Sequence, residues 1–244
     1  MKLCPTSASE RGQAIAAWMD AQDVDIWLLT EVRRDWDPRG GRLVVAPPRG
    51  IDNKEKRWAG IETALPLGGL RERPTLEHAA EEGLALTRLE VGGARPSSVL
   101  VACSVLPWRG AGEYWPGLPV SQAAQFRYVL DHHVARIGAE RLPGEPLIWG
   151  GDFNQQLTRP FWGATVGGAT ALRSAFDRLG LVAMTEQAQH LNADSHAIDH
   201  LAVSRDLVVV DSVAAVHRPG WGGGQLSDHA AYTAEVRVTI PTGS

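Results

Sequence analysis

Apolar residues along the chain form many short runs and few helical patterns. Ile15, Trp18 and Met19 recur at helical spacing behind Ser9, a suitable N-cap, and a strand is predicted directly afterwards at 24–30. Further strands are predicted at 42–46, 59–65, 84–91, 98–106, 146–149, 197–203, 207–216 and 230–239. Helices are predicted at 120–137 and 169–179. Nine predicted strands and three predicted helices indicate an α/β protein rich in sheet, without strict alternation of strand and helix.

The length of 244 residues is sufficient for one large hydrophobic core. Stretches rich in Gly and Pro at 39–50, 66–74 and 107–119 are short and lie between apolar segments, so we interpret them as surface loops. No repeat or low-complexity tract is visible. We therefore expect a single domain over residues 1–244.

The formal net charge of −4 argues against a protein that holds duplex DNA mainly by counterion release, since such proteins carry a basic face. Eight Lys and Arg residues nevertheless fall between Arg33 and Arg57. They form either a solvated charged loop or a local site for an anionic substrate, with Arg57 as a candidate substrate contact.

Cysteine content and hydropathy bear on the cellular setting. Cys4 and Cys103 are too few for a disulfide scaffold and do not have metal-ligand spacing. No apolar run is long enough to span a membrane. A reduced, cytoplasmic setting is the simpler expectation, and the sequence does not indicate an oligomeric state.

Four apolar runs each lead to an acidic residue. The clearest is Leu147–Asn154, in which a buried strand is followed by Gly150, Gly151 and Asp152, with Asn154 two residues later. The other three acids are Glu31, Asp199 and Asp228, the last followed by His229. Each motif alone has an ordinary alternative, such as a turn or a surface acid. Together they predict a carboxylate cluster with a histidine at a sheet edge.

The order of these motifs resembles that of the endonuclease/exonuclease/phosphatase superfamily of metal-dependent phosphoesterases, which includes apurinic endonucleases and pancreatic-type deoxyribonucleases. The matching positions are Glu31, Gly151 to Asn154, Asp199 and Ser227 to His229, so the resemblance spans nearly the whole chain. It implies an α/β fold, a four-layer α-β-β-α sandwich of two mixed sheets with outer helices. It also implies hydrolysis of phosphodiester or phosphomonoester bonds by metal-assisted attack of water.

Metal binding is expected at Glu31, with Asp228 as a second ligand. Mg²⁺ fits such a site, because it is commonly held by one or two carboxylates and keeps several waters for the substrate. Mn²⁺ is the alternative ion.

The resemblance assigns the remaining roles. Asp152 corresponds to the residue that orients or deprotonates the attacking water, and Asn154 to an amide that contacts the scissile phosphate. His229 corresponds to the phosphate-contacting histidine, and Asp199 to the acid that fixes its tautomer. An Asp-His couple also occurs in serine hydrolases, but the chain has no Gly-x-Ser-x-Gly elbow. His200 is expected to point to the opposite face of its strand, and Asp131–His133 to form a polar helix face.

Two departures from the family pattern favour a second hypothesis. Relatives usually carry an Asn on a first strand, which would fall near Lys2 or before the sequence begins, and a His or Tyr where this chain has Val105. Trp108 or Arg109 in the following loop is the candidate replacement for the missing donor. The alternative is therefore a weak or inactive relative that binds a phosphorylated ligand or partner through the same cleft.

The substrate is left open between nucleic acid and a small phosphorylated molecule. Among nine Trp residues, Trp108, Trp115 and Trp221 lie in predicted loops, which suits a small or single-stranded substrate that stacks on aromatic rings as well as, or better than, duplex DNA. Trp18, Trp27 and Trp149 lie in apolar runs and are expected in the core.

Overall fold

A computed structural model of the chain describes residues 6–38, 40–49, 55–71, 79–92, 97–115, 117–118, 121–158, 163–191, 195–205, 208–217, 220–221 and 224–238. Its helices are α1 (Glu10–Asp20), α2 (Gln122–Glu140) and α3 (Gly168–Arg178), with short 3-10 turns at Ala79–Gly83 and Ala111–Tyr114. The strands are β1 (Ile26–Arg33), β2 (Arg42–Val45), β3 (Lys56–Thr63), β4 (Leu67–Gly68), β5 (Leu84–Val91), β6 (Ser97–Val105), β7 (Leu147–Asp152), β8 (Leu181–Ala183), β9 (Asp199–Ser204), β10 (Val208–His217), β11 (Gly220–Trp221), β12 (Gly224–Gln225) and β13 (Ala231–Val238). Every predicted helix and strand is present, with ends shifted by a few residues.

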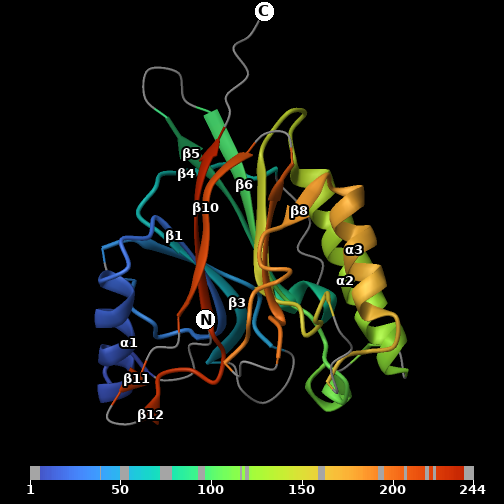
Figure 1. Ribbon diagram of the computed structural model, residues 1–244, viewed down its shortest axis with the longest axis horizontal. Coiled ribbons are helices and arrows are strands. Elements are labelled where there is room, and N and C mark those ends of the chain that lie inside the picture. Colours follow the sequence, from blue (N-terminus) through green and yellow to red (C-terminus); the bar gives the residue numbers. More distant parts are fainter. Residues whose placement is uncertain are drawn as a thin grey trace, which may run out of the picture.

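Two sheets and three helices make the predicted four-layer sandwich. From one side to the other the layers are α1, the antiparallel sheet β1-β3-β2, the sheet β4-β5-β6-β7-β9-β8, and the pair α2 and α3 (Figure 1). The six-stranded sheet is mixed, because β6 and β7 run parallel while its other pairs are antiparallel. An antiparallel ribbon of β10 and β13 lies in front of these layers in the same view.

Local sequence explains where α1 begins and which side it buries. The Ser9 hydroxyl accepts a hydrogen bond from the Gly12 amide at 3.0 Å, as the predicted N-cap should. Ile15 and Met19, four residues apart, are buried against Leu29 and Val32 of β1. The helix therefore covers the outer face of the smaller sheet.

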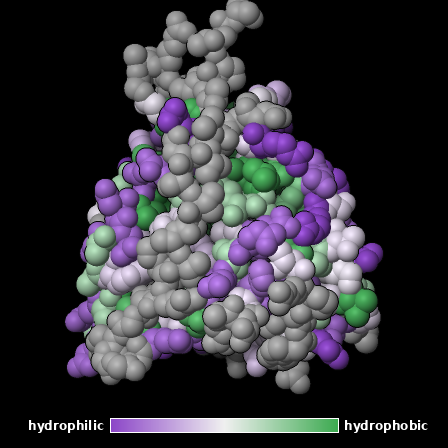
Figure 2. All heavy atoms as spheres, in the orientation of Figure 1, coloured by the Kyte–Doolittle hydropathy of each residue, from purple (hydrophilic) through white to green (hydrophobic). Residues whose placement is uncertain are grey.

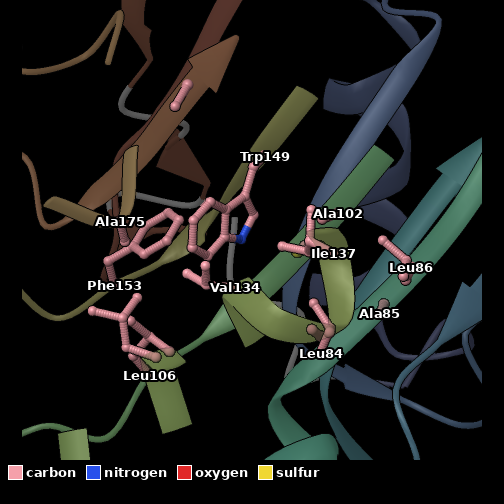
Figure 3. Packing of buried hydrophobic residues seen from close by; sticks show 14 of the residues in the cluster. Leu84, Ala85, Leu86, Ala102, Leu106, Val134, Ile137, Trp149, Phe153 and Ala175 are labelled. Atoms are coloured by element: carbon pink, nitrogen blue, oxygen red, sulfur yellow. The ribbon is translucent and has the colours of Figure 1, made fainter. Parts of the chain in front are cut away.

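The main core lies between the sheets and beneath α2 and α3. In Figure 3, the indole of Trp149 on β7 lies beside Phe153, with Val134 and Ile137 of α2 close by. The Trp149 and Phe153 rings meet edge to face with centroids 5.2 Å apart, and both residues are fully buried. This packing fixes the carboxyl end of β7, where the Asp152 motif begins.

The exterior is mixed in polarity. On the face seen in Figure 2, apolar atoms are confined to patches between hydrophilic ones. Within the described part of the chain, no helix has the length and apolarity needed to cross a membrane.

Candidate active site

Two glycines bring β7 close to its neighbours just before Asp152. A methyl group on Gly151 would lie 2.0 Å from the Ser104 carbonyl oxygen of β6, and the φ angle of Gly151 is +129°. A methyl group on Gly150 would lie 2.6 Å from Leu28 and 2.9 Å from the His200 carbonyl oxygen. The Gly-Gly pair is therefore a steric requirement for placing Asp152 at the end of this strand.

Asp152 and Asp199 lie opposite each other in the antiparallel pairing of β7 with β9. Asp199 accepts hydrogen bonds from His229 Nδ1, at 2.9 Å to one carboxylate oxygen and 3.1 Å to the other. Asp199 is 6% exposed, so the pair is largely shielded from water. The structure thus brings together two acids and the histidine from three motifs widely separated in sequence.

The three groups have different protonation behaviour. Burial raises the pKa of Asp152 to about 7, and the nearby Asp199 charge adds to the effect. Burial also acts to raise the pKa of Asp199, but the charge and hydrogen bond of His229 outweigh it and leave that pKa below its ordinary value. Burial acts to lower the pKa of His229, yet attraction to Asp199 raises it to about 10. Near neutral pH the His229–Asp199 pair is ionic, while Asp152 lies near its titration midpoint.

Asn154 is held rigidly next to Asp152. Its side-chain Nδ2 donates to the Leu106 carbonyl at 2.9 Å, and its backbone N–H donates to Asp152 Oδ1 at 3.0 Å. The residue is 8% exposed and has a φ of +52°. The amide is therefore fixed at the end of β6 and β7, with its second N–H and its oxygen left to face other groups.

Glu31 approaches Asp152 from the opposing sheet. Its negative charge contributes to the raised pKa of Asp152, which places the two carboxylates within electrostatic range of each other. Glu31 also has a positive φ, +51°. Only three non-glycine residues in the described chain have a positive φ, and Glu31 and Asn154 are two of them. Strained backbone of this kind concentrates at functional sites.

Asp228 and His229 lie on a short loop before β13. The Ser227 hydroxyl accepts the His229 backbone N–H at 3.1 Å, and Arg11 of α1 donates to the Leu226 carbonyl. Asp228 is exposed, and its charge helps to raise the pKa of His229. The loop thus presents an acid at the surface next to the buried Asp199–His229 pair.

His190 joins this group without any sequence signal that predicted it. Its ring lies 5.8 Å from that of His229 between centroids, in an edge-on arrangement. The irregular segment between β8 and β9 is held by the Tyr232 hydroxyl, which donates to Gln189, and by the His190 amide, which donates to Ser195. No periodic pattern marks such a segment, so only the folded chain shows the proximity.

Among the described residues, one group of three side chains places potential metal-ligand atoms close together. One N or O atom each from His190, Asp199 and His229 lie within 4.8 Å of one another. A metal there would have to replace the proton shared by Asp199 and His229, and imidazole ligands favour transition metals over Mg²⁺. Glu31 and Asp228, the predicted ligands, are not in this group, although carboxylate oxygen is the ligand type that Mg²⁺ or Mn²⁺ prefers.

The residues predicted to contact substrate, Arg57, Trp108 and Arg109, differ in how far they are exposed to solvent. Arg57 is largely buried on β3, and its charge interacts with Arg34 and Glu55. Trp108 is partly buried and Arg109 exposed, in the loop that follows β6. Trp115 is 1% exposed and therefore belongs to the core rather than to a stacking surface. Lys2 and the side chain of Trp221 lie outside the described residues.

Val105 and His133 are two further positions where the structure can be compared with the sequence prediction. Val105 pairs with Asp152 and is 2% exposed, so no donor lies at that position. His133 was expected on a polar helix face, but it is fully buried between the Ser104 hydroxyl and the Ala80 carbonyl. Burial lowers the pKa of His133 to about 4. His133 is thus a neutral core residue.

A cavity beside β1 and β9 does not coincide with this polar cluster. It has a volume of about 730 Å³ and is lined by residues of β1, β9 and β13. Of the predicted catalytic and metal-binding residues, only Asp199 is among the described residues that line it. We therefore place the reactive groups at the sheet edge where β6 and β7 end, rather than in this cavity.

Comparisons with known proteins identify the family. Residues 5–229 match the model of the Endonuclease/Exonuclease/phosphatase family. No curated protein matches the sequence significantly.

Solved structures share the fold at low identity. The human Nocturnin catalytic domain with bound sulfate is 19% identical with a TM-score of 0.64, covering 96% of this chain and 88% of that one. An AP endonuclease from Archaeoglobus fulgidus is 13% identical with a TM-score of 0.63, covering 97% and 98%. An endonuclease/exonuclease/phosphatase from Beutenbergia cavernae is 14% identical with a TM-score of 0.63, covering 98% and 70%. With its family match over nearly the whole length and its shared fold, the chain belongs to the endonuclease/exonuclease/phosphatase family.

Proposed function

We propose that the protein is a metal-dependent phosphoesterase that cleaves phosphate esters by attack of water. The observation that carries this proposal is the geometry at the sheet edge, where Asp152 lies opposite Asp199 and the Asp199 carboxylate is hydrogen-bonded to His229 Nδ1 at 2.9 Å. A general base works best when its pKa lies near the working pH, and the pKa of Asp152 is raised to about 7. Asp199 is held ionised by His229 and is therefore unsuited to the same task.

Asp152 accepts the proton of the attacking water in this scheme. The Asn154 backbone N–H, bonded to Asp152 Oδ1, fixes the orientation of the carboxylate toward the end of β7. The Asn154 amide lies beside it and supplies a hydrogen bond to a phosphate oxygen. Both groups are held by the strand ends, so little reorganisation is needed when substrate binds.

His229 supplies the positive charge. Its bond to Asp199 through Nδ1 leaves Nε2 as the atom that donates to a phosphate oxygen or protonates the leaving group. Because the pKa of His229 is raised to about 10, the imidazolium persists throughout the physiological range. Asp199 acts through His229 as a positioning residue.

A divalent cation, Mg²⁺ or Mn²⁺, would be held by Glu31 with Asp228 as a second ligand. When bound, it would neutralise charge on the phosphate and among the clustered carboxylates. Members of the family typically depend on such ions, which supports the assignment.

The first experiment compares hydrolysis of a phosphodiester, a phosphomonoester and single- and double-stranded DNA with Mg²⁺, Mn²⁺ or EDTA. Asp152→Asn should lower kcat/KM by at least about 100-fold, the lower end of what a general base contributes. Asp177→Asn, on the exposed side of α3, is the matched control and should leave the rate unchanged. Metal-independent turnover, or full activity in Asp152→Asn, would contradict the proposal.

A second candidate is a relative that binds phosphorylated ligands without cleaving them. The apolar Val105 opposite Asp152 favours it, because a donor expected there is missing. Metal-dependent binding of a phosphorylated ligand without turnover in the same panel would select this candidate.

A further inference from the structure

An aromatic cluster lies beside the Asp152–Asn154 motif. Trp58 of β3 stacks on Trp115, with centroids 5.3 Å apart and planes 6° apart, and both residues are 1% exposed. Trp108 meets Trp58 edge-on at 5.8 Å, and Tyr114 lies 5.4 Å from Trp108. Tyr114 is 43% exposed. The cluster therefore has a buried floor of two indoles and an outer layer of half-buried Trp108 and exposed Tyr114.

The backbone fixes this outer layer relative to the proposed catalytic groups. The Leu106 amide donates to the Asp152 carbonyl at 2.9 Å, and the Leu106 carbonyl accepts from the Asn154 amide at 2.9 Å. Trp108 follows only two residues later, so at most about 7 Å of chain separates it from that anchor. On the far side, the Arg109 amide donates to the Gly163 carbonyl at 3.0 Å. The loop is thus held at both ends next to Asn154.

Two arginines adjoin the cluster, one buried and one exposed. The Arg49 guanidinium lies 3.5 Å from the centroid of Trp58, a cation–π contact beneath the floor. Arg109, directly after Trp108, is exposed. An exposed Tyr ring near an exposed Arg in the same loop region suits a ligand that carries both aromatic bases and phosphates. A lipid headgroup or sugar phosphate has no aromatic ring for these side chains to stack on.

We propose that Trp108 and Tyr114 form a base-stacking subsite and that the substrate is a single-stranded nucleic acid. The inference rests on the proposed phosphoesterase function and deepens it by naming the substrate class. Bases in a duplex are already stacked on each other, so only unpaired bases can reach these rings without an unstacking penalty. The net charge of −4 likewise lacks the basic face that duplex binding requires.

The test measures binding without cleavage. A fluorescein-labelled oligothymidine and an abasic oligomer of the same length and charge are titrated with the protein in EDTA, and anisotropy reports the Kd. Stacking of one base is worth about 1–3 kcal/mol, so the wild type should prefer oligothymidine by about 10-fold. Equal affinity for both oligomers would overturn the proposal.

Variants locate the effect. Tyr114→Ala should reduce the preference by about 5-fold or more, whereas Tyr114→Phe should keep it because the ring remains. Tyr128→Ala on α2 is the matched control, since Tyr128 is 41% exposed, close to the 43% of Tyr114. Trp108→Phe keeps a ring against Trp58 and should weaken the preference without unfolding the chain, which circular dichroism checks. A preference unchanged in Tyr114→Ala, or lost equally in Tyr128→Ala, would refute the subsite.

The two proposals fail in different ways. If the oligothymidine preference holds but no substrate is cleaved, the stacking subsite stands and the hydrolytic function falls. If esters are cleaved with Mg²⁺ but the wild type does not distinguish the oligomers, the hydrolytic function stands and the subsite falls.

Discussion

Replacing Asp152 by Asn should stabilise the metal-free protein while removing activity. The carboxylate is half-buried near Asp199 and Glu31, and its pKa is raised from 3.8 to about 7. Ionising it in the folded state is therefore unfavourable compared with ionising it in the unfolded chain. Asn carries no charge, and its side-chain oxygen can accept the same N–H of Asn154.

The magnitude follows from proton linkage. The difference between 3.8 and about 7 corresponds to about 4 kcal/mol at 1.36 kcal/mol per pKa unit. Asp152 remains partly accessible to solvent, and its charge also attracts His229, so we expect about half of this gain, about 2 kcal/mol.

The sign depends on pH. A group whose folded pKa is raised contributes stability below its unfolded pKa and loses it as pH rises through the folded value. The advantage of Asp152→Asn should therefore be largest above about pH 7 and shrink as the pH approaches 3.8.

Urea unfolding in EDTA measures the effect, with the midpoint compared at about pH 8 and about pH 5. The slope of the transition should not change, because the surface exposed on unfolding is the same. Asp177→Asn serves as the exposed control. A variant equal to or less stable than the wild type at about pH 8 would refute the reasoning about Asp152.

Three further predictions concern the scaffold and the ion pairs. Gly151→Ala should destabilise the fold by about 3 kcal/mol in urea unfolding, because its methyl group would overlap the Ser104 carbonyl. Gly138→Ala, in open space on α2, should instead stabilise the fold by about 0.5–1 kcal/mol. Equal effects of the two substitutions would contradict the steric argument. Asp199→Asn should bring the pKa of His229 from about 10 down toward 6.5, measured by NMR titration of its ring; an unchanged value would exclude Asp199 as the cause. Glu145→Gln should lower the free energy of unfolding by about 3 kcal/mol at neutral pH, because it removes the carboxylate that lies 2.6 Å from the buried Arg88 guanidinium. A decrease below about 1 kcal/mol would show that water or other groups compensate for the lost charge.

Apolar patterning was enough to predict the main elements. The run that ends at Asp152 predicted β7, and Ser9 predicted the start of α1, because both signals are local to the chain. The ordered motifs, through their resemblance to a family, predicted the sandwich of two sheets. The very short strands β4, β8, β11 and β12 were missed, since two or three residues carry no periodicity and are ordered by their neighbours.

The surroundings of single polar residues were harder to predict. His133 looked like part of a polar helix face, yet a hydroxyl from β6 and a carbonyl from the 3-10 turn at Ala79–Gly83 satisfy both ring nitrogens in the core. His190 reaches His229 from an irregular connection. Both positions depend on contacts between segments far apart in sequence, which no local pattern contains.

The cluster of acids also bears on the choice between an enzyme and a binding protein. Asp152, Asp199 and Glu31 repel one another, and in the described part of the chain positive φ angles at Glu31 and Asn154 add strain of about 1–3 kcal/mol each. A site that only bound phosphate would be hindered by these acids, because they repel the same anion. A bound cation would offset that repulsion and strengthen phosphate binding under either hypothesis. Only the enzyme hypothesis uses a base whose pKa lies near 7, which is why the Asp152→Asn rate distinguishes them more directly than any binding measurement.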